Sequence, residues 1–320
     1  MILETKKSAA YWKALILRAL WAYGVRPGDK VVRFLPRLGL QHIGFFWDNL
    51  FNLPSLRPAF IDLSDEVAAN IQQIMKIRPH VLYIQPSSLV RLMNYLEKRE
   101  MKLCFRKILT MGETLTQTLR RRFEDFFSAE VYDRYSTVEV GNIAWECPTH
   151  TAYHINVDSV VLEVVNAKTA GRGVTKGEAV VTCLYRYATP IIRYKTGDLV
   201  EVVDDECPCG RGLPLLKSVE GRIVDCIVRK DGELISPYAI ASRLEHVNGV
   251  RRFKVLQDKN YSVEVFVVPS DDVDGEKLVN SVKAELSEIL RGLDFGVKLV
   301  DKIVEQQGKK FKMVESLVER

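Results

Sequence analysis

The chain has 320 residues, of which 47% are hydrophobic and 27% are charged, and these proportions exclude a disordered, collagen-like or simple coiled-coil chain. The net charge of +5 is the small difference between 46 basic and 41 acidic residues. The basic runs lie apart and no aromatic-basic repeat accompanies them, so we expect an anionic small molecule as ligand and no nucleic acid.

The first 140 residues alternate between helical and extended patterns. Trp12, Leu15 and Ala19 lie on one face of a predicted helix that ends near Gly24. Further along the chain we predict a helix that is capped by Ser64 and ends near Pro79, and helices at 87–97 and 116–127. We predict strands at 30–35, 81–84, 107–111 and 131–135. This order is typical of an α/β domain with a parallel sheet.

From Asp158 onward the hydrophobic period changes to two, as in VVLEVVN and EAVVTCL, which predicts a small antiparallel, barrel-like β section. Beyond Arg222, we predict helices at 237–247 and 274–291 and strands at 252–257, 261–268 and 297–300. We therefore expect a large domain over residues 1–221 and a small α+β domain over residues 222–320.

The apolar stretches are too short and too often interrupted by charge to span a bilayer, and the first residues lack the pattern of a signal peptide. Six scattered cysteines are too few for a disulfide scaffold. Both observations favour a cytoplasmic protein without a membrane partner.

Cysteine spacing also indicates a metal site. Cys207 and Cys209 are separated by one residue and followed by Gly210, which permits a tight turn. Together with Cys147 and either His154 or His150, they could form a tetrahedral Cys₃His zinc site. The alternative is a set of buried free cysteines, because this spacing is shorter than that of most zinc pairs.

Eight segments occur in a characteristic order: MGETLT, YSTVEV, EC, YHI, TPIIRYKTGDLVEV, CPCGR, VEGRIVD and QGKKFK. This series resembles the phenylacetate-CoA ligase branch of the adenylate-forming enzymes. The resemblance implies the adenylate-forming fold, with an AMP-binding domain at 1–221 and a rotating lid domain at 222–320. It also implies ATP or AMP, Mg²⁺ and CoA as cofactors, an aryl or arylacetic acid as substrate, and a structural zinc.

The resemblance assigns roles to several of these residues. A carboxylate at the Thr-Gly-Asp turn can accept both hydroxyl hydrogens of a ribose, which is the role implied for Asp198; a capping aspartate is the alternative. The adenine is expected to pack near Gly112 and Glu113 and to stack on Tyr135, while Arg222 contacts the ribose or a phosphate.

Two further residues are assigned to catalysis by the resemblance. Glu139 would hold Mg²⁺, although Val138 stands where the family has a hydroxyl residue, and a solvated surface glutamate is the alternative. Lys309 would neutralise charge at the α-phosphate during adenylation, and a solvated lysine tail is the alternative.

One expected motif does not occur in the sequence. The family's Ser/Thr/Gly-rich phosphate loop precedes a helix like the one predicted at 8–21, and no such loop is found in the 320 residues. We therefore consider a missing N-terminal segment or a separate polypeptide that supplies it, and a second hypothesis of a non-catalytic nucleotide-binding protein. The acyl pocket is expected to include Phe45, Phe46 and Trp47, with a core helix as the alternative.

Overall fold

The computed structural model describes residues 3–35, 59–63, 65–304 and 312–319. These residues form two compact units. The first unit contains most of the chain up to Ser218, and the second contains Val219 onward with the short segments 116–119 and 197–199. Among the described residues, no helix has both the length and the apolar content needed to cross a bilayer.

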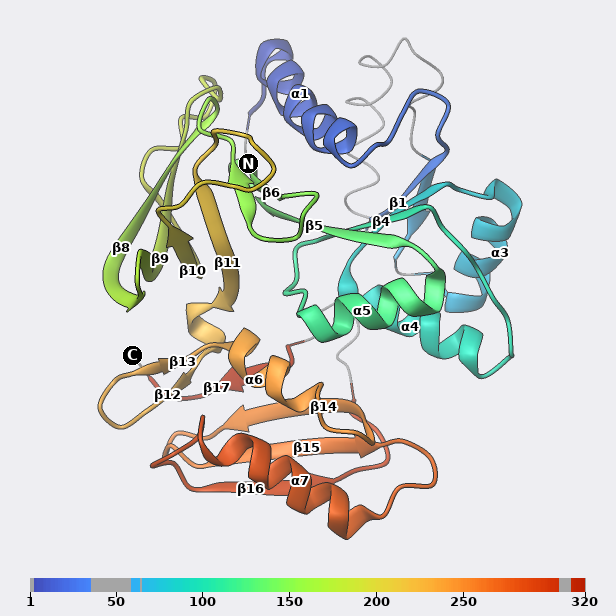
Figure 1. The fold of residues 1–320 in the computed structure, drawn as a ribbon, viewed down its shortest axis with the longest axis vertical. Helices are drawn as coiled ribbons and strands as arrows, with labels where there is room; N and C mark the ends of the chain where they lie inside the picture. The colour runs from blue at the N-terminus through green and yellow to red at the C-terminus, as the bar shows by residue number, and fades with distance from the viewer. Residues whose placement is uncertain (1–2, 36–58, 64, 305–311, 320) are drawn as a thin grey trace. The chain divides into compact units, whose positions relative to one another are not determined.

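The first part of an eleven-stranded sheet is parallel, as predicted (Figure 1). Its strands, in spatial order, are β2 (Ala59–Asp62), β1 (Val31–Leu35), β3 (Val81–Ile84), β4 (Lys107–Met111) and β5 (Glu130–Thr137). They are connected by α3 (Val67–Ile77), α4 (Pro86–Glu97) and α5 (Gln117–Phe127). Strands buried on both faces account for the near-continuous apolar runs in the sequence.

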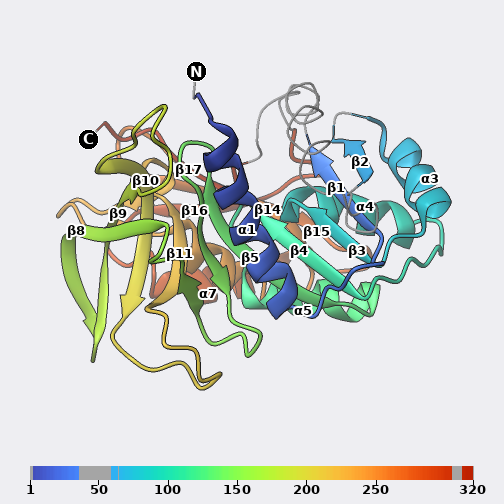
Figure 2. The same cartoon turned by 90° about the horizontal axis from the view of Figure 1, so that it is seen from above.

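Helix α1 (Lys6–Ala22) lies across one face of this sheet, and α4 and α5 lie on the opposite face (Figure 2). The N-terminus of α1 is fixed by a capping box in which Thr5 and Ser8 exchange hydrogen bonds. Ala19 and Tyr23, at the end of α1, pack with Leu109 and Trp145 in one buried cluster. Helix α1 therefore packs over the sheet face on which the cavity described below lies.

The sheet continues in antiparallel strands after β5. These strands are β6 (Gly141–Glu146), β7 (Tyr153–Ile155), β8 (Val160–Gly171), β9 (Val174–Cys183), β10 (Tyr194–Val203) and β11 (Leu215–Arg222). Their spatial order after β5 is β6-β7-β11-β10-β9-β8, so β7 pairs with β11 across a long stretch of sequence. This pairing brings the β6–β7 hairpin next to the loop between β10 and β11.

The second unit has its own core. A four-stranded sheet has the order β16 (Phe295–Leu299), β15 (Val263–Pro269), β14 (Val250–Gln257) and β17 (Val314–Ser316). The helices α6 (Pro237–Leu244) and α7 (Gly275–Ser287) bury Leu244, Leu278 and Val282 in this core. A short 3₁₀ turn, η2 (Ile223–Asp225), and the hairpin β12 (Ile227–Val228) and β13 (Leu234–Ile235) precede α6.

Candidate nucleotide and metal sites

Asp198 and Arg222 lie at neighbouring positions in the structure. Asp198 is on β10, directly after Gly197 in the left-handed conformation (φ +74°), and Arg222 is the last residue of β11. The Arg222 Nε atom is 3.9 Å from Asp198 Oδ1. The carboxylate is largely buried whereas the guanidinium is exposed, so the pair presents an acceptor and a cation at one position.

Gly112 and Glu113 follow β4. Gly112 has φ +73°, and a Cβ atom added there would meet nothing within 4 Å, so the backbone is open to close approach. The Glu113 carboxylate accepts hydrogen bonds from the Ser87 backbone N–H (2.8 Å) and hydroxyl (3.0 Å). Because Ser87 is in the first turn of α4, this carboxylate caps the helix, a structural function that the sequence did not indicate.

Tyr135 is buried on β5, and its hydroxyl donates to Thr196 Oγ1 at 3.2 Å on β10. Glu139 is half-buried in the turn between β5 and β6. No hydrogen bond or ion pair joins the Glu139 carboxylate to another residue in the described part of the chain.

Some predicted site residues lie outside the described residues, namely Lys309, Phe45, Phe46 and Trp47. The nearby Lys312 is described, and its Nζ atom forms an ion pair with Asp225 Oδ1 at 2.6 Å. This ion pair holds Lys312 at the η2 turn directly after Arg222.

Four candidate metal ligands meet at the β6–β7 hairpin and the β10–β11 loop. The ligand atoms of Cys147, His154, Cys207 and Cys209 all lie within 4.8 Å of one another. The Cys147 and Cys207 sulfurs are 3.4 Å apart, and Cys209 Sγ is 3.2 Å from His154 Nε2. Tetrahedral zinc with bonds of about 2.3 Å to sulfur requires ligand separations of about 3.8 Å, so small shifts would complete the geometry.

The electrostatic environment favours the ligating forms of Cys209 and His154. Burial raises the pKa of Cys209, but hydrogen bonds involving Arg211 outweigh it and bring the pKa to about 7. Burial, with the charge of Arg211, lowers the pKa of His154, which keeps the imidazole neutral. Burial raises the pKa of Cys147 in the absence of a cation. A bound cation would offset that effect, because metal binding favours thiolate.

The choice between the two histidines follows from the strand geometry. His154 is fully buried on β7 with its ring against Trp145 and its Nε2 toward Cys209. His150 instead lies with Nδ1 3.1 Å from Arg120 Nη1 and 3.2 Å from Glu146 Oε1. The structure therefore groups His154, and not His150, with the thiols.

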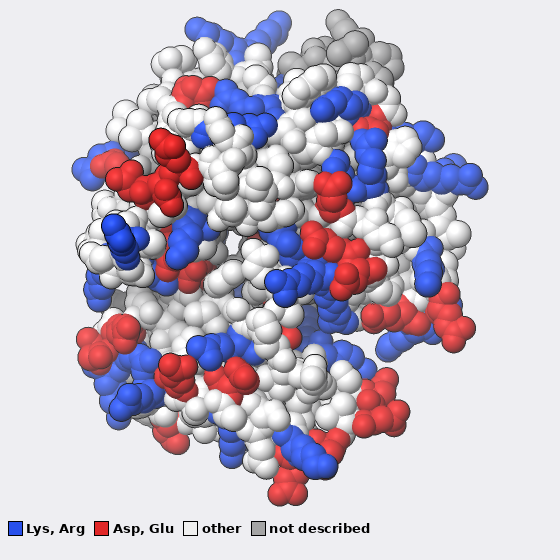
Figure 3. Space-filling model, viewed as in Figure 1, with Lys and Arg blue, Asp and Glu red and all other residues white. Residues whose placement is uncertain are grey.

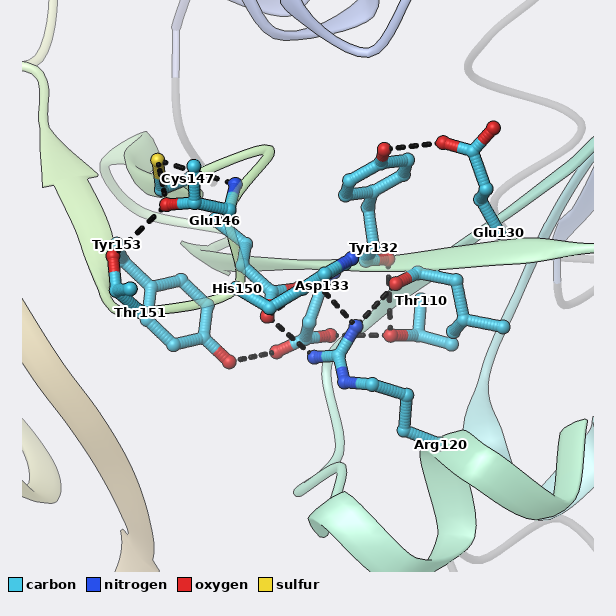
Figure 4. Close-up of polar contacts among 12 residues, drawn as sticks. Thr110, Arg120, Glu130, Tyr132, Asp133, Glu146, Cys147, His150, Thr151 and Tyr153 are labelled. Carbon is cyan, nitrogen blue, oxygen red and sulfur yellow. Dashed lines mark hydrogen bonds and ion pairs between the residues drawn. The ribbon is translucent and has the colours of Figure 1, made fainter. Parts of the chain in front are cut away.

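A buried charged network, which was not predicted from the sequence, lies beside the metal ligands (Figure 4). Arg120 on α5 donates to Glu146 Oε1 at 2.5 Å, and Glu146 Oε2 accepts from the Asp133 N–H at 2.7 Å. The Asp133 carboxylate accepts from Thr110 (2.5 Å) and Tyr153 (2.8 Å). The network joins α5 and the parallel strands to the hairpin of the first two metal ligands.

Burial dominates the titration of this network. It raises the pKa of Asp133 to about 6, helped by the charge of Glu146 and opposed by the hydrogen bonds and by Arg120. Burial alone would lower the pKa of Arg120, but Glu146 reverses the direction. The signal available in the sequence was a pair of charged residues, Asp133 and Arg134, inside an otherwise apolar strand.

Basic and acidic side chains are interspersed over the surface of each unit on the face drawn in Figure 3. Exposed pairs such as Lys298 with Glu264 (2.6 Å) account for part of this pattern. Such pairs contribute about 1 kcal/mol or less to stability and create no strong field of one sign.

Comparison with known proteins gives a consistent result. No family model matches the chain. The sequence is 26% identical over 246 residues to Protein CapK of Staphylococcus aureus, which covers 75% of this chain and 53% of that protein. It is 25% identical over 240 residues to phenylacetate-coenzyme A ligase of Thermus thermophilus, covering 70% of this chain and 52% of the ligase.

The crystal structure of 2-hydroxyisobutyryl-CoA ligase in the postadenylation state superimposes with a TM-score of 0.80 and 22% identity, covering 98% of this chain and 70% of that chain. The chain spans about half the length of the curated relatives it matches. The chain therefore has the fold of the adenylate-forming CoA ligases, and its sequence is homologous to those of phenylacetate-coenzyme A ligases.

Proposed function

We propose that this chain acts in an AMP-forming acid-CoA ligase reaction of the phenylacetate-CoA ligase type. An aryl or arylacetic acid would react with ATP to form an acyl-adenylate and release pyrophosphate. The acyl group would then pass to the CoA thiol, with AMP as the leaving group. The observation that carries the proposal is the homology to phenylacetate-coenzyme A ligases. The adjacency of Asp198 and Arg222 supports it, because the acceptor and the cation implied for the ribose and a phosphate lie together.

The chain's own residues have distinct roles in this proposal. The Asp198 carboxylate accepts both ribose hydroxyl hydrogens, and Arg222 offers a cation to the same nucleotide. Gly112 lets the nucleotide approach the backbone, and Tyr135 contacts the base. Bound Mg²⁺ would supply charge neutralisation at the phosphates, and the Glu139 carboxylate would hold it.

The remaining proposed roles concern Lys309 and the second unit. Lys309 would place an ammonium near the carboxylate and the α-phosphate, where negative charge develops during adenylation. Residues 222–320 would act as the lid that brings this lysine to the nucleotide. Gly221, directly before Arg222, has φ +106°. A Cβ atom added to Gly221 would lie 3.1 Å from the Pro237 ring, so a side chain at this position would be strained.

We also propose that Cys147, His154, Cys207 and Cys209 hold a structural zinc. All four positions are occupied by protein ligands, which is typical of closed structural sites and leaves none for a substrate. The metal would hold the β6–β7 hairpin against the β10–β11 loop.

Pyrophosphate exchange tests the ligase proposal. The purified chain would be assayed for ATP–pyrophosphate exchange with phenylacetate and benzoate, and for AMP binding by calorimetry. We expect Asp198→Asn to weaken AMP binding about tenfold or more, because a charge-assisted hydrogen bond contributes about 1.5–3 kcal/mol. Asp271→Asn, at a highly exposed carboxylate, is the matched control and should bind AMP like the wild type. If Asp198→Asn and Asp271→Asn bind AMP equally tightly, Asp198 is not part of the AMP site.

A non-catalytic nucleotide-binding protein is the second candidate. It is favoured by one observation, the lack of a Ser/Thr/Gly-rich phosphate loop in the 320 residues. Losing such preorganised donors costs about two to three orders of magnitude in rate for each donor, so we expect at most trace exchange by the chain alone. AMP binding that depends on Asp198 without any exchange, even when an N-terminal segment with the loop is supplied, would favour this candidate.

A further inference from the structure

A cavity lies between α1 and the parallel sheet of the first unit. Most of its wall is apolar, with Ile16 and Leu20 from α1 and Leu109 and Tyr132 from the strands. Two arginines, Arg33 on β1 and Arg134 on β5, also line it. A charged group in an apolar wall requires a partner, because burying an unpaired charge costs several kcal/mol.

Arg134 has no anionic partner among the described residues. It is 7% exposed, and its Nε atom makes no hydrogen bond within the described chain. Within the described part of the chain, the one acceptor for its Nη2 atom is the weak acceptor Met111 Sδ, at 3.8 Å. Burial, with the positive charge of Arg33, lowers the pKa of Arg134 to about 9, and no carboxylate opposes this shift.

Tyr83 provides a second unsatisfied polar group in the same wall. Its ring lies against both guanidinium groups, with each arginine Cζ 4.9 Å from the ring centroid. The Tyr83 hydroxyl is buried and has no hydrogen-bond partner within the described residues. A donor hydroxyl and a guanidinium therefore lie together in one apolar cavity, and both are suited to bind an anion.

The nearest carboxylate in the sequence cannot serve as this anion. Asp133 precedes Arg134 on β5, and alternation along a strand directs the two side chains to opposite faces. The Asp133 carboxylate is already bonded to Thr110 and Tyr153. The anion must therefore come from outside this set of residues, and an apolar body attached to it would fill the rest of the cavity.

We propose that this cavity binds the acid substrate, and that the substrate carries a second anionic group that Arg134 and Tyr83 bind. The assignment rests on the proposed ligase function. Thr110 and Arg134 line the cavity and lie two residues before Gly112 and one residue before Tyr135, so the cavity lies along the same two strands as two of the proposed nucleotide contacts. The carboxylate that reacts loses its charge on adenylation. A second anion keeps its charge through both steps and keeps Arg134 paired.

Calorimetry without nucleotide tests this inference. The probes are 4-carboxyphenylacetate, with two carboxylates, and phenylacetate, with one. We expect the wild type to bind the diacid about tenfold or more tightly than phenylacetate, because of the added charge-assisted hydrogen bonds. Arg134→Met should abolish this preference and Tyr83→Phe should reduce it. Arg99→Met, at an exposed arginine that stacks on Tyr95 with its Cζ 3.7 Å from the ring centroid, should leave it unchanged.

A stability measurement separates binding from a structural role. Removing an unpaired buried charge should raise the urea midpoint of Arg134→Met without ligand, whereas removing a structural contact would lower it. A lower midpoint, equal wild-type affinity for the two acids, or a preference that survives Arg134→Met would overturn the inference. Diacid preference without pyrophosphate exchange, even when an N-terminal segment with the phosphate loop is supplied, would refute the ligase proposal alone. Exchange with equal affinity for the two acids would refute this inference alone.

Discussion

The pair of Arg120 and Glu146 is expected to be strongly coupled in folding. Both side chains are almost completely buried, at 5% and 3% exposure, and their charged atoms are 2.5 Å apart. Removal of one member of a buried pair costs about 3–5 kcal/mol, because the remaining charge has no counter-charge. We therefore expect Arg120→Met and Glu146→Gln each to lower the free energy of unfolding by that amount.

The double variant should be much less affected than the sum of its parts. With both charges removed, neither member of the pair is left as an uncompensated charge, and the glutamine introduced by Glu146→Gln still offers a carbonyl oxygen to the Asp133 N–H. We expect the double variant to lose about 1–3 kcal/mol, which implies a coupling of about 3 kcal/mol or more.

Urea unfolding followed by tryptophan fluorescence measures all four proteins, since buried Trp145 lies on β6 beside the network. The control is the exposed pair of Arg243 and Glu288, 3.2 Å apart, whose coupling should be about 1 kcal/mol or less. If the losses in the buried cycle simply add, the two charges do not depend on each other and the reasoning fails.

Three further outcomes are expected. The raised pKa of Asp133, about 6 against about 3.9 unfolded, means that the fold binds this proton more tightly, so the free energy of unfolding should fall by about 3 kcal/mol as pH rises from about 4 to about 6. In Asp133→Asn, the urea midpoint should no longer fall as pH rises across this range. An unchanged fall would show that another group causes it. Gly141→Ala should cost about 2–4 kcal/mol in thermal unfolding, because the added Cβ meets Tyr185 Oη at 2.6 Å at a φ of +90°; a neutral result would contradict the close packing. Elemental analysis should find about one zinc per chain and markedly less in Cys207→Ser, and full retention there would exclude the site.

Much of the fold could be predicted because hydrophobic pattern and strand position agree. The apolar runs at Val81–Ile84 and Lys107–Met111 are confirmed as adjacent parallel strands. By contrast, β2 (Ala59–Asp62) and β17 (Val314–Ser316) were missed, because both are short and have no alternation of their own. Their pairing with β1 and β14 defines them, and such pairing is not visible in a local pattern.

The metal ligands were more predictable than the charged network. The Cys207-x-Cys209 spacing predicted a cluster, but it could not decide which histidine joins it. Strand β7 decides this, because it directs Tyr153 toward Asp133 and His154 toward the thiols. The cavity arginines and Asp133 were missed for a different reason. Charged residues in an apolar strand are indistinguishable by sequence from residues at an exposed edge until the neighbouring strands are placed.

The candidate metal ligands come in two local pairs that are far apart in the chain. Cys147 and Cys207 are separated by 60 residues, and all of β7, β8, β9 and β10 lies between them. A metal bound there would act as a cross-link, and closing a loop of this length removes unfolded-state entropy equivalent to about 4 kcal/mol. Metal supply would then determine whether this antiparallel part of the sheet stays closed, and metal-depleted chains would be most open to proteolysis in the segment between the two cysteines.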